Sequence, residues 1–257
     1  MFETIQRFKN SINNGVLQLG CGITLTDSVV TEALGSSVDF FWIDLEHTHI
    51  DLNSLKGHLI AARATNTPAL VRVRGSSIEH IKPILDIGAD GIIVPQVRST
   101  DEVQHVVDEC RYSPLGRRGF GPRAPSNYGR EGGAEYLQAA NESLFVSVQI
   151  ENQSALDQVE SIAAIPGLDS LILGPYDLSM SMGYAGDVHH ENVVRAMQRV
   201  SSTAREAGKL IGMGGVDEQL AKVAQSIGIQ WYQCGDDFSH MIKEFDRMSD
   251  SIRSHQD

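Results

Sequence analysis

The sequence predicts one α/β domain over residues 1–257, folded as a single (β/α)8 barrel of the TIM type. Apolar strand-like runs alternate eight times with helix-like segments, and no linker or further internal repeat interrupts the alternation. The length of 257 residues suits such a barrel, which takes roughly 250 residues. An open dinucleotide-binding sheet would need the pattern GxGxxG after its first strand, but Leu25 stands at the place of the third glycine. We therefore expect a closed barrel.

The amino-terminal half supplies four of the expected strands. A short amphipathic helix comes first and is ended by Asn13, Asn14 and Gly15. Asp27 or Ser28 can then cap a helix that leads to a strand of almost continuous apolar character, which is typical of a parallel strand covered on both faces. The strands are expected at 16–21, 38–45, 68–73 and 90–95. The helices are expected at 2–13, 27–34, 51–64, 77–87 and from 100 or 101 to about 112.

The carboxyl-terminal half opens with a long loop, because prolines and glycines recur throughout residues 113–133. In the strand that follows, every second residue is apolar and the others are mixed, which is the period of a strand. The strands of this half are expected at 144–151, 169–173, 209–212 and 230–233. The helices are expected at about 134–140 and 155–164, at 190–207 and 217–227, and from 236 onward.

The composition limits the classes of partner. The net charge is −12 and the pI is about 5.1, so a nucleic acid or an anionic membrane surface is not the expected partner. The three cysteines lie far apart without a CxxC pair, which suits a reducing compartment and neither a zinc site nor a disulfide framework. No apolar run approaches the length of a membrane span, and the first ten residues lack the apolar core of a secretion signal. We expect a cytoplasmic protein.

Two carboxylates follow two consecutive strands of the predicted barrel. Glu151 ends the strand at 144–151, and Asp177 comes just after Gly174 and Pro175, which close the next strand. The carboxyl ends of barrel strands meet at one rim, and carboxylate oxygens suit Mg²⁺ or Mn²⁺. Either residue alone would be better explained as a helix cap or a turn residue. Together they favour a metal site.

A second polar group follows the strand at 38–45. It contains Asp44, Glu46 and His47, and the barrel would bring it to the same rim. A histidine beside carboxylates and a metal is suited to act as a general base. The alternative is that His47 is exposed in a loop, as we expect for His49, and that the two carboxylates only form structural hydrogen bonds.

Arg72 lies inside a strand, between Val71 and Val73, where an unpaired guanidinium would be costly to bury. It either pairs with Glu151 or Asp44, or binds a substrate carboxylate in the planar two-bond geometry of arginine. The arginines of the loop 113–133 have neither Walker spacing nor a helix start behind them, so we interpret this segment as a flexible active-site loop.

The sequence also disfavours other kinds of catalysis. The lysines are expected in helices or at the amino end of a strand, so none is placed for a Schiff base at the active rim. A metal would then have to stabilise any enolate. A GxSxG motif is absent, and no cysteine is expected in a strand-end loop beside a histidine, which disfavours acyl-transfer hydrolysis.

Several segments together resemble the HpcH/HpaI family of metal-dependent pyruvate aldolases, of the phosphoenolpyruvate/pyruvate barrel superfamily. The resemblance covers nearly the whole chain, and its specificity lies in the order of the segments. They are WIDLEH (42–47), Val71-Arg72, LDIGADGIIVP (85–95), RYSPLGRRGFG (111–121), VQIEN (148–152) and LGPYDLSMSMGY (173–184).

The resemblance implies a role for each candidate residue. Glu151 and Asp177 would bind the metal, Mg²⁺ or Mn²⁺ with Co²⁺ as a further candidate, and Arg72 would hold the oxo-acid. His47 would act as acid and base through metal-bound water. The supporting residues would be Asp44 and Asp86, and the substrate pocket would include Gln149, Gly174, Pro175 and Tyr176. Tyr176 stands where many members have a small residue, and this difference leaves the identity of the second substrate open.

The implied activity is that of a class II aldolase, a lyase that breaks or forms a C–C bond between the enolate of pyruvate, or of a related 2-oxo acid, and an aldehyde. Its substrates would include 4-hydroxy-2-oxo acids. The alternative is an oxaloacetate-using condensing enzyme of the same family, such as a siderophore-pathway citrate synthase, which would use another electrophile. A barrel that only binds oxo-acids is disfavoured by the complete set of candidate residues. The family also implies homo-oligomers, dimers that form hexamers, in which the last helix is exchanged between subunits.

Overall fold

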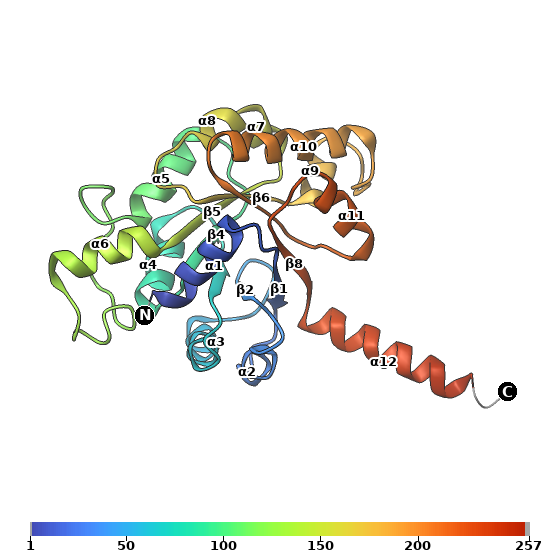
Figure 1. The fold of residues 1–257 in the computed structure, drawn as a ribbon, viewed down its shortest axis with the longest axis horizontal. Coiled ribbons are helices and arrows are strands. Elements are labelled where there is room, and N and C mark those ends of the chain that lie inside the picture. Colours follow the sequence, from blue (N-terminus) through green and yellow to red (C-terminus); the bar gives the residue numbers. More distant parts are fainter. Residues whose placement is uncertain (1, 255–257) are drawn as a thin grey trace.

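The computed structural model describes residues 2–254, and within them eight parallel strands close into a barrel (Figure 1). Each strand pairs with the next along the chain, and the last pairs with the first. This arrangement confirms the predicted (β/α)8 barrel. The strands are β1 (Gln18–Ile23), β2 (Phe40–Asp44), β3 (Ala69–Arg72), β4 (Gly91–Val94), β5 (Phe145–Ile150), β6 (Ser170–Leu173), β7 (Leu210–Met213) and β8 (Trp231–Asp236).

Helices surround the barrel, with one or two between successive strands. The helix before β1 is α1 (Glu3–Asn13), and α2 (Val29–Leu34), α3 (Leu52–Ala64) and α4 (Ile78–Ile87) follow the first three strands. The next ones are α5 (Thr100–Cys110), α6 (Gly133–Ser143), α7 (Gln153–Asp157), α8 (Val159–Ala163), α9 (Pro175–Ser181), α10 (Glu191–Glu206), α11 (Glu218–Ser226) and α12 (Asp237–Arg253). In the described part of the chain, no helix combines the length and apolarity that crossing a bilayer requires.

The strands bury alternate side chains on opposite sides. In β5, Val148 and Ile150 belong to the large apolar cluster between the sheet and the helices, whereas Phe145 packs inside the barrel, 5.7 Å from the ring of Trp231. The period-two pattern predicted for this strand is therefore confirmed. Its polar member Gln149 points into the cavity of the barrel.

Helix α1 closes the amino end of the barrel. Its Phe8 packs against the first residues of three strands, with ring-centroid distances of 5.3 Å to Phe40, 5.6 Å to Phe145 and 6.1 Å to Trp231. Burial of these large rings seals that end with apolar surface. The carboxyl ends of the strands are left as the open end.

Several elements are shifted or lengthened by one to three residues, as β1 and β8 are, and two regions differ from the expectation in more than their bounds. The helix expected at 155–164 is divided into α7 and α8 at Gln158, whose side chain accepts from the Thr100 N–H (3.1 Å) and donates to the Arg98 carbonyl (3.1 Å). The segment after β6 contains α9, which was not expected. Its Pro175 stands at the start of the helix, where a proline is tolerated because the missing N–H would have no partner there.

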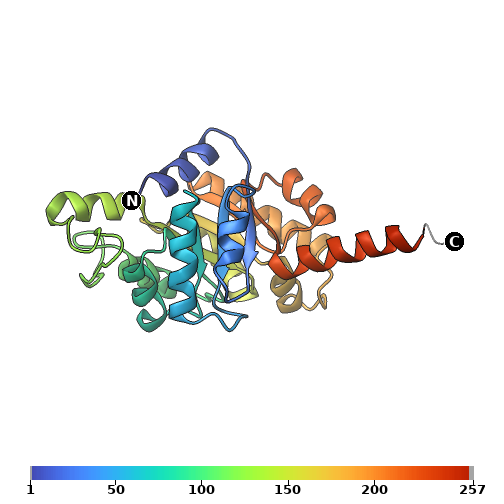
Figure 2. The same ribbon diagram turned by 90° about the horizontal axis from the view of Figure 1, so that it is seen from below.

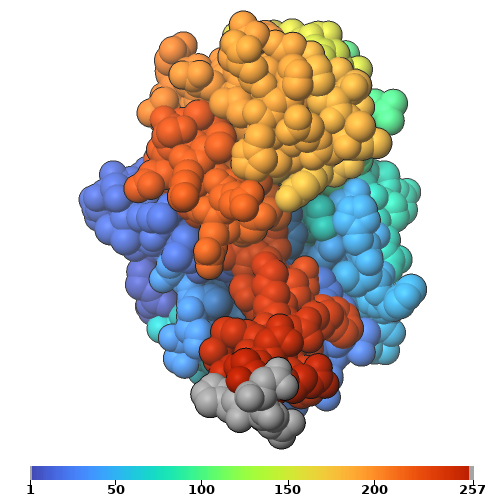
Figure 3. All heavy atoms as spheres, turned by 90° about the vertical axis from the view of Figure 1, so that its right-hand side faces the viewer, coloured from blue at the N-terminus to red at the C-terminus, as the bar shows by residue number. Residues whose placement is uncertain are grey.

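The last helix, α12, leaves the body of the protein (Figures 1 and 2). Asp236 caps it, and the buried carboxylate of Asp237 accepts hydrogen bonds from the N–H groups of Thr24 (2.9 Å) and Leu25 (3.0 Å). One set of its side chains is apolar and 47% to 64% exposed: Phe238, Met241, Ile242, Phe245, Met248 and Ile252. In Figure 3 this helix extends toward the viewer from the side of the barrel.

Candidate active site

A cavity of about 830 Å³ opens at the carboxyl end of the barrel and extends outward between α11 and α12. Its inner wall includes most of the residues that the sequence singled out: Asp44, Arg72, Gln149, Gly174, Pro175, Tyr176 and Asp177. The guanidinium of Arg72 lies over the ring of Trp42, with its carbon 5.5 Å from the ring centroid. The barrel thus brings residues from β2, β3, β5 and the segment after β6 to one place.

Arg72 is bound by two carboxylates at the carboxyl end of β2, those of Asp44 and Glu46. Its Nε and Nη2 donate to the two oxygens of Asp44 at 2.9 and 2.7 Å, and its Nη1 lies 3.2 Å from Glu46 Oε2. Of the two possibilities left open by the sequence, internal pairing with Asp44 is therefore present. A guanidinium has five N–H donors, so two remain for another acceptor.

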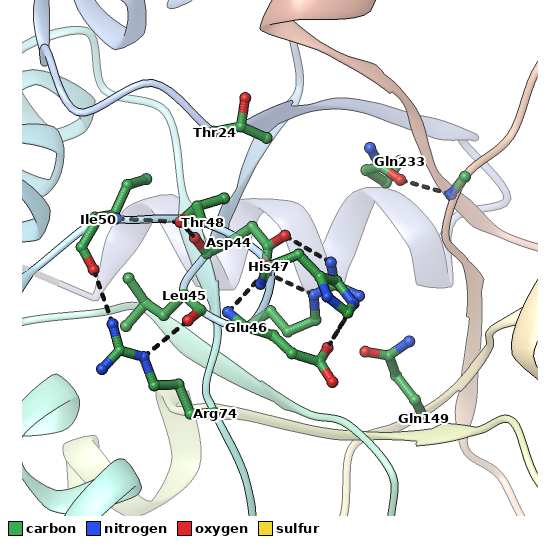
Figure 4. Close-up of polar contacts among 12 residues, drawn as sticks. Thr24, Asp44, Leu45, Glu46, His47, Thr48, Ile50, Arg74, Gln149 and Gln233 are labelled. Atoms are coloured by element: carbon green, nitrogen blue, oxygen red, sulfur yellow. Dashed lines mark hydrogen bonds and ion pairs between the residues drawn. The ribbon is translucent and has the colours of Figure 1, made fainter.

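The segment after β2 is held rigidly by its own hydrogen bonds (Figure 4). Asp44 accepts from the N–H of Glu46 (2.9 Å), and its carbonyl accepts from the Thr48 hydroxyl. Arg74 donates to the carbonyls of Leu45 (2.9 Å) and Ile50 (3.4 Å) from below. These contacts fix the backbone that carries Glu46 and His47.

His47 projects from this segment toward solvent, with 64% of its side chain exposed. Its Nε2 lies 3.4 Å from Glu46 Oε2, so Glu46 stands between the histidine and Arg72. Burial raises the pKa of Glu46, the charges of Asp44 and Asp177 raise it further, and Arg72 and His47 oppose them. His47 itself does not belong to the cavity wall of a single chain.

Glu151 is buried, with 2% exposure, and both of its oxygens accept a hydrogen bond. Oε1 accepts from the N–H of Gln96 at 2.7 Å, and Oε2 accepts from Gln149 Nε2 at 2.8 Å. Burial raises the pKa of Glu151 to about 7; the Gln96 N–H lowers it, whereas the charges of Asp177 and Glu46 raise it. The site therefore has more negative charge than Arg72 alone neutralises.

Gly174 leaves room for the buried carboxylate of Glu151. A Cβ at position 174 would lie 2.3 Å from Glu151 Oε2, closer than any side-chain carbon can be. Gly174 lines the cavity and Glu151 does not, so this oxygen lies directly behind the bare Cα of Gly174. Asp177 lies in the first turn of α9 and is exposed, and the ring of the neighbouring Tyr176 contacts the surface of Gly215.

The donor set fits a divalent cation such as Mg²⁺. Within residues 2–254 no three His, Cys, Asp or Glu side chains are grouped as metal ligands, so the chain would contribute the two carboxylates of Glu151 and Asp177. Mg²⁺ is commonly bound by one or two carboxylates, with water and substrate oxygens completing its shell. Burial is the main cause that raises the pKa of Glu151, and the charge of Asp177 raises it further. A cation bound between these two carboxylates would offset both effects.

Asp86 lies away from this cluster in the same chain. It belongs to the last turn of α4, which lies toward the amino end of the barrel, and pairs with Lys82 (3.2 Å) and Arg118 (3.7 Å). Lys222 and Lys243 line the outer part of the cavity but belong to α11 and α12 rather than to the barrel interior.

The contact of Gln96 with Glu151 could not be predicted from the sequence. Its contribution is a backbone N–H, which every residue except proline has, so the residue type carried no signal. Pro95 marked the end of the strand but could not reveal the direction of the next N–H group.

The chain is similar to known proteins over most of its length. The model of the family described as HpcH/HpaI aldolase/citrate lyase matches residues 24–243. A hydroxypyruvate/pyruvate aldolase of Pseudomonas aeruginosa is 35% identical, over 93% of this chain and 90% of that protein. A 4-hydroxy-2-oxo-heptane-1,7-dioate aldolase of Shigella sonnei is also 35% identical, over 90% and 88%. Among solved structures, that of citrate synthase SbnG superposes with a TM-score of 0.85 at 28% identity, over 97% of this chain and 98% of that chain.

Proposed function

The chain belongs to the HpcH/HpaI aldolase/citrate lyase family and is an enzyme of the aldolase class, and on this basis we propose that it is a divalent-metal-dependent lyase. Its reaction would break or form a C–C bond between the enolate of pyruvate, or of a related 2-oxo acid, and an aldehyde. The single observation that carries the proposal is that Asp177 and Arg72 line the cavity at the open end of the barrel, and that the charges of both act on the buried carboxylate of Glu151.

Glu151 and Asp177 would hold the metal, Mg²⁺ or Mn²⁺ and in a further option Co²⁺. When bound, such an ion supplies a Lewis acid that stabilises the negative charge of an enolate. Gln149 and the Gln96 N–H orient Glu151 by fixing one lone pair on each of its oxygens. The wall formed by Gly174, Pro175 and Tyr176 would enclose the substrate.

Arg72 would hold the carboxylate of the 2-oxo acid. Asp44 accepts hydrogen bonds from Nε and Nη2 of Arg72, and these bonds fix the orientation of the N–H groups that remain. Arginine binds carboxylates with a defined planar geometry that a lysine ammonium does not reproduce. The carbonyl end of the substrate would then lie on the side of Gln149 and Gly174.

His47 would exchange the hydroxyl proton. In the cleavage direction it takes the proton from the 4-hydroxyl group, the bond between C3 and C4 breaks, and the aldehyde forms. The electron pair remains on the pyruvate fragment as an enolate, which then takes up a proton at C3. Asp44 supports this role through the backbone of the segment that carries His47, and Asp86 could take part only at the site of another copy of the chain.

The second candidate is the condensing reaction, in which an enolate derived from oxaloacetate adds to an electrophile other than an aldehyde. The observation that favours it is the similarity to the citrate synthase structure over almost the whole chain. Both reactions need the same metal and the same Arg72, so they differ only at the outer part of the cavity.

We also propose that the enzyme is a homo-oligomer, a dimer or hexamer, in which α12 is exchanged between subunits. The helix carries an apolar face that its own barrel does not cover. The outer surface beside β1 and β8 is open and includes the exposed side chains of Leu17 and Leu19 next to Tyr232. The apolar face of α12 from a second copy would cover it. The three free cysteines favour the reducing cytoplasm.

Pyruvate release from a 4-hydroxy-2-oxo acid, measured with Mg²⁺ or Mn²⁺ and after chelation, tests the proposed function. We expect activity that is lost on chelation and restored by the ion. Full activity without metal, or an imine with pyruvate that borohydride traps, would reject it. Turnover of oxaloacetate with an acyl thioester but not of any hydroxy-oxo acid would favour the condensing reaction.

A further inference from the structure

Gln96 has a left-handed backbone conformation at the carboxyl end of β4. Its φ is +56°, in a region that is unfavourable for residues with a Cβ and that glycine, asparagine and aspartate accept most readily. Glutamine is none of these, and its side chain is exposed to solvent. Packing of the side chain therefore does not explain the conformation.

The conformation directs one backbone N–H at a buried carboxylate. The nitrogen of Gln96 lies 2.7 Å from Glu151 Oε1, a separation typical of hydrogen bonds to a charged acceptor. β4 and β5 are neighbours in the barrel, so residue 96 stands beside the end of the strand that carries Glu151. Unusual backbone conformations of this kind persist where the surrounding structure holds them, often at active sites.

Residues 97–100, which follow Gln96, are hydrogen-bonded to the segment after β5. Asn152 Nδ2 donates to the carbonyl of Val97 at 2.9 Å. Gln158 accepts from the N–H of Thr100 and donates to the carbonyl of Arg98, both at 3.1 Å. The segment that follows β5 thus holds residues 97–100 in place, directly after the residue whose N–H binds Glu151.

The other oxygen of Glu151 is fixed independently. Gln149 Nε2 donates to Oε2 at 2.8 Å, and Gly174 makes room for that oxygen. Each oxygen therefore has one fixed donor and keeps a lone pair for another partner. The carboxylate is held in one orientation by two donors from opposite sides.

We propose that Gln96 is a positioning residue, whose left-handed backbone conformation orients the Glu151 carboxylate toward a divalent cation. The inference rests on the proposed function in one respect, the role of Glu151 as metal ligand. Since the donor belongs to the main chain, the requirement at position 96 is conformational. Glycine meets it, whereas a β-branched side chain opposes it.

The first experiment measures Mn²⁺ affinity by calorimetry on the intact chain. Gln96→Val should weaken binding by about 10-fold or more, the scale found when residues that orient a metal ligand are changed, and Gln96→Gly should restore most of it. The matched control is Asn66→Val. Asn66 has almost the same φ, +58°, but lies in the turn between α3 and β3 at the other end of the barrel, so its variant should lose stability without losing affinity.

The second experiment needs no metal. Hydrogen exchange followed by mass spectrometry should find the amide of residue 96 protected in the parent and exchanging faster in Glu151→Ala. The turn at Asn66 should exchange alike in both proteins, which controls for a general loosening of the fold.

The outcomes separate this inference from the proposed function. Equal affinity of the parent and Gln96→Val, or an equal loss in Asn66→Val, overturns the positioning role. A parent that binds no divalent cation rejects the proposed metal site instead. Exchange at residue 96 then decides the contact by itself, and an amide that is unprotected or indifferent to Glu151→Ala overturns the inference.

Discussion

The carboxylate of Asp44 binds the guanidinium of Arg72 side-on, with two hydrogen bonds of 2.9 and 2.7 Å from Nε and Nη2. The two residues are register partners on the adjacent strands β2 and β3. The pair solves the problem of a charged residue within a strand, since each desolvated charge neutralises the other. It also fixes the direction in which Arg72 presents its remaining N–H groups to the cavity.

Arg72→Lys should lower kcat/KM by roughly 10- to 100-fold, because a lost hydrogen bond to a charged group is worth about 1.5–3 kcal/mol. Steady-state cleavage of a hydroxy-oxo acid checks this. Arg199→Lys is the matched control, since Arg199 also makes two bonds to a carboxylate, that of Glu160, but on the surface. Near-parent activity of a folded Arg72→Lys protein would mean that Arg72 does not hold the substrate.

His47→Ala and Glu151→Ala should fail differently. The first should keep metal and pyruvate bound but slow turnover by roughly 10²- to 10⁴-fold, the contribution of a positioned acid or base. The second should lose metal affinity together with activity. Calorimetry beside the cleavage assay distinguishes them. Loss of metal binding in His47→Ala would make it a ligand or a structural residue, and parent-like cleavage would direct the search for the base to Asp44.

Gly174→Ala should abolish metal binding through a single methyl group. The new Cβ would stand 2.3 Å from Glu151 Oε2, so the carboxylate must leave its two donors or the strand end must move. Gly132→Ala is the control, because a Cβ there meets no atom within 4 Å and its backbone is extended. Titration with Mn²⁺ measures both variants, and unchanged affinity in Gly174→Ala would exclude Glu151 Oε2 from the metal site.

Phe245→Glu should shift the protein toward smaller species in light scattering coupled to size exclusion. Phe245 is 64% exposed on the apolar face of α12, and a charge there would have to be buried if a second subunit covers it. Val29→Glu, at a side chain 63% exposed on α2, controls for the added charge. An unchanged mass for Phe245→Glu would place α12 outside the subunit contact.

His58 should make the protein less stable in mild acid. It is fully buried, its Nδ1 lies 2.7 Å from the Thr31 hydroxyl, and burial lowers its pKa below the usual 6.5. Below about pH 6.5 the unfolded chain binds a proton that the folded chain refuses, so the free energy of unfolding falls as the pH drops toward the pKa of the folded state. Above that pH the residue is neutral in both states and has no effect.

His58→Gln should reduce this dependence, although its packing costs stability at every pH. Urea titrations at several pH values between 5 and 7.5 give the slopes to compare. Parallel curves for parent and variant would contradict the assignment.

The barrel could be predicted because the sequence patterns of its strands and helices are local and recur along the chain. Eight apolar runs with intervening helix-like segments specify the topology, and the alternation in β5 specifies which side chains enter the barrel. The same alternation predicted that Glu151 and Asp177 follow two neighbouring strands, since strand ends share a rim, and both residues do follow β5 and β6. The loop at residues 113–132, which contains neither helix nor strand, followed from its prolines and glycines.

Other features depended on contacts between distant segments. Gln158 divides a helix because its side chain binds a turn some 60 residues earlier along the chain, and no periodicity reports such a bond. The Gly-Pro pair after β6 indicated a break, yet the proline begins α9. Asp86 belongs to the family-like segment 85–95, but its contacts are set by its position at the end of α4, where it pairs with Lys82.

Closure of the amino end of the barrel by α1 has a consequence for the order of product release. With Phe8 filling that end, whatever enters the cavity must leave by the mouth through which it came. On the proposed chemistry the 2-oxo acid lies deeper, against Arg72, and the aldehyde lies nearer the mouth. Cleavage should therefore release its products in a compulsory order, aldehyde first and pyruvate last, and only pyruvate should compete with the hydroxy-oxo acid for the free enzyme.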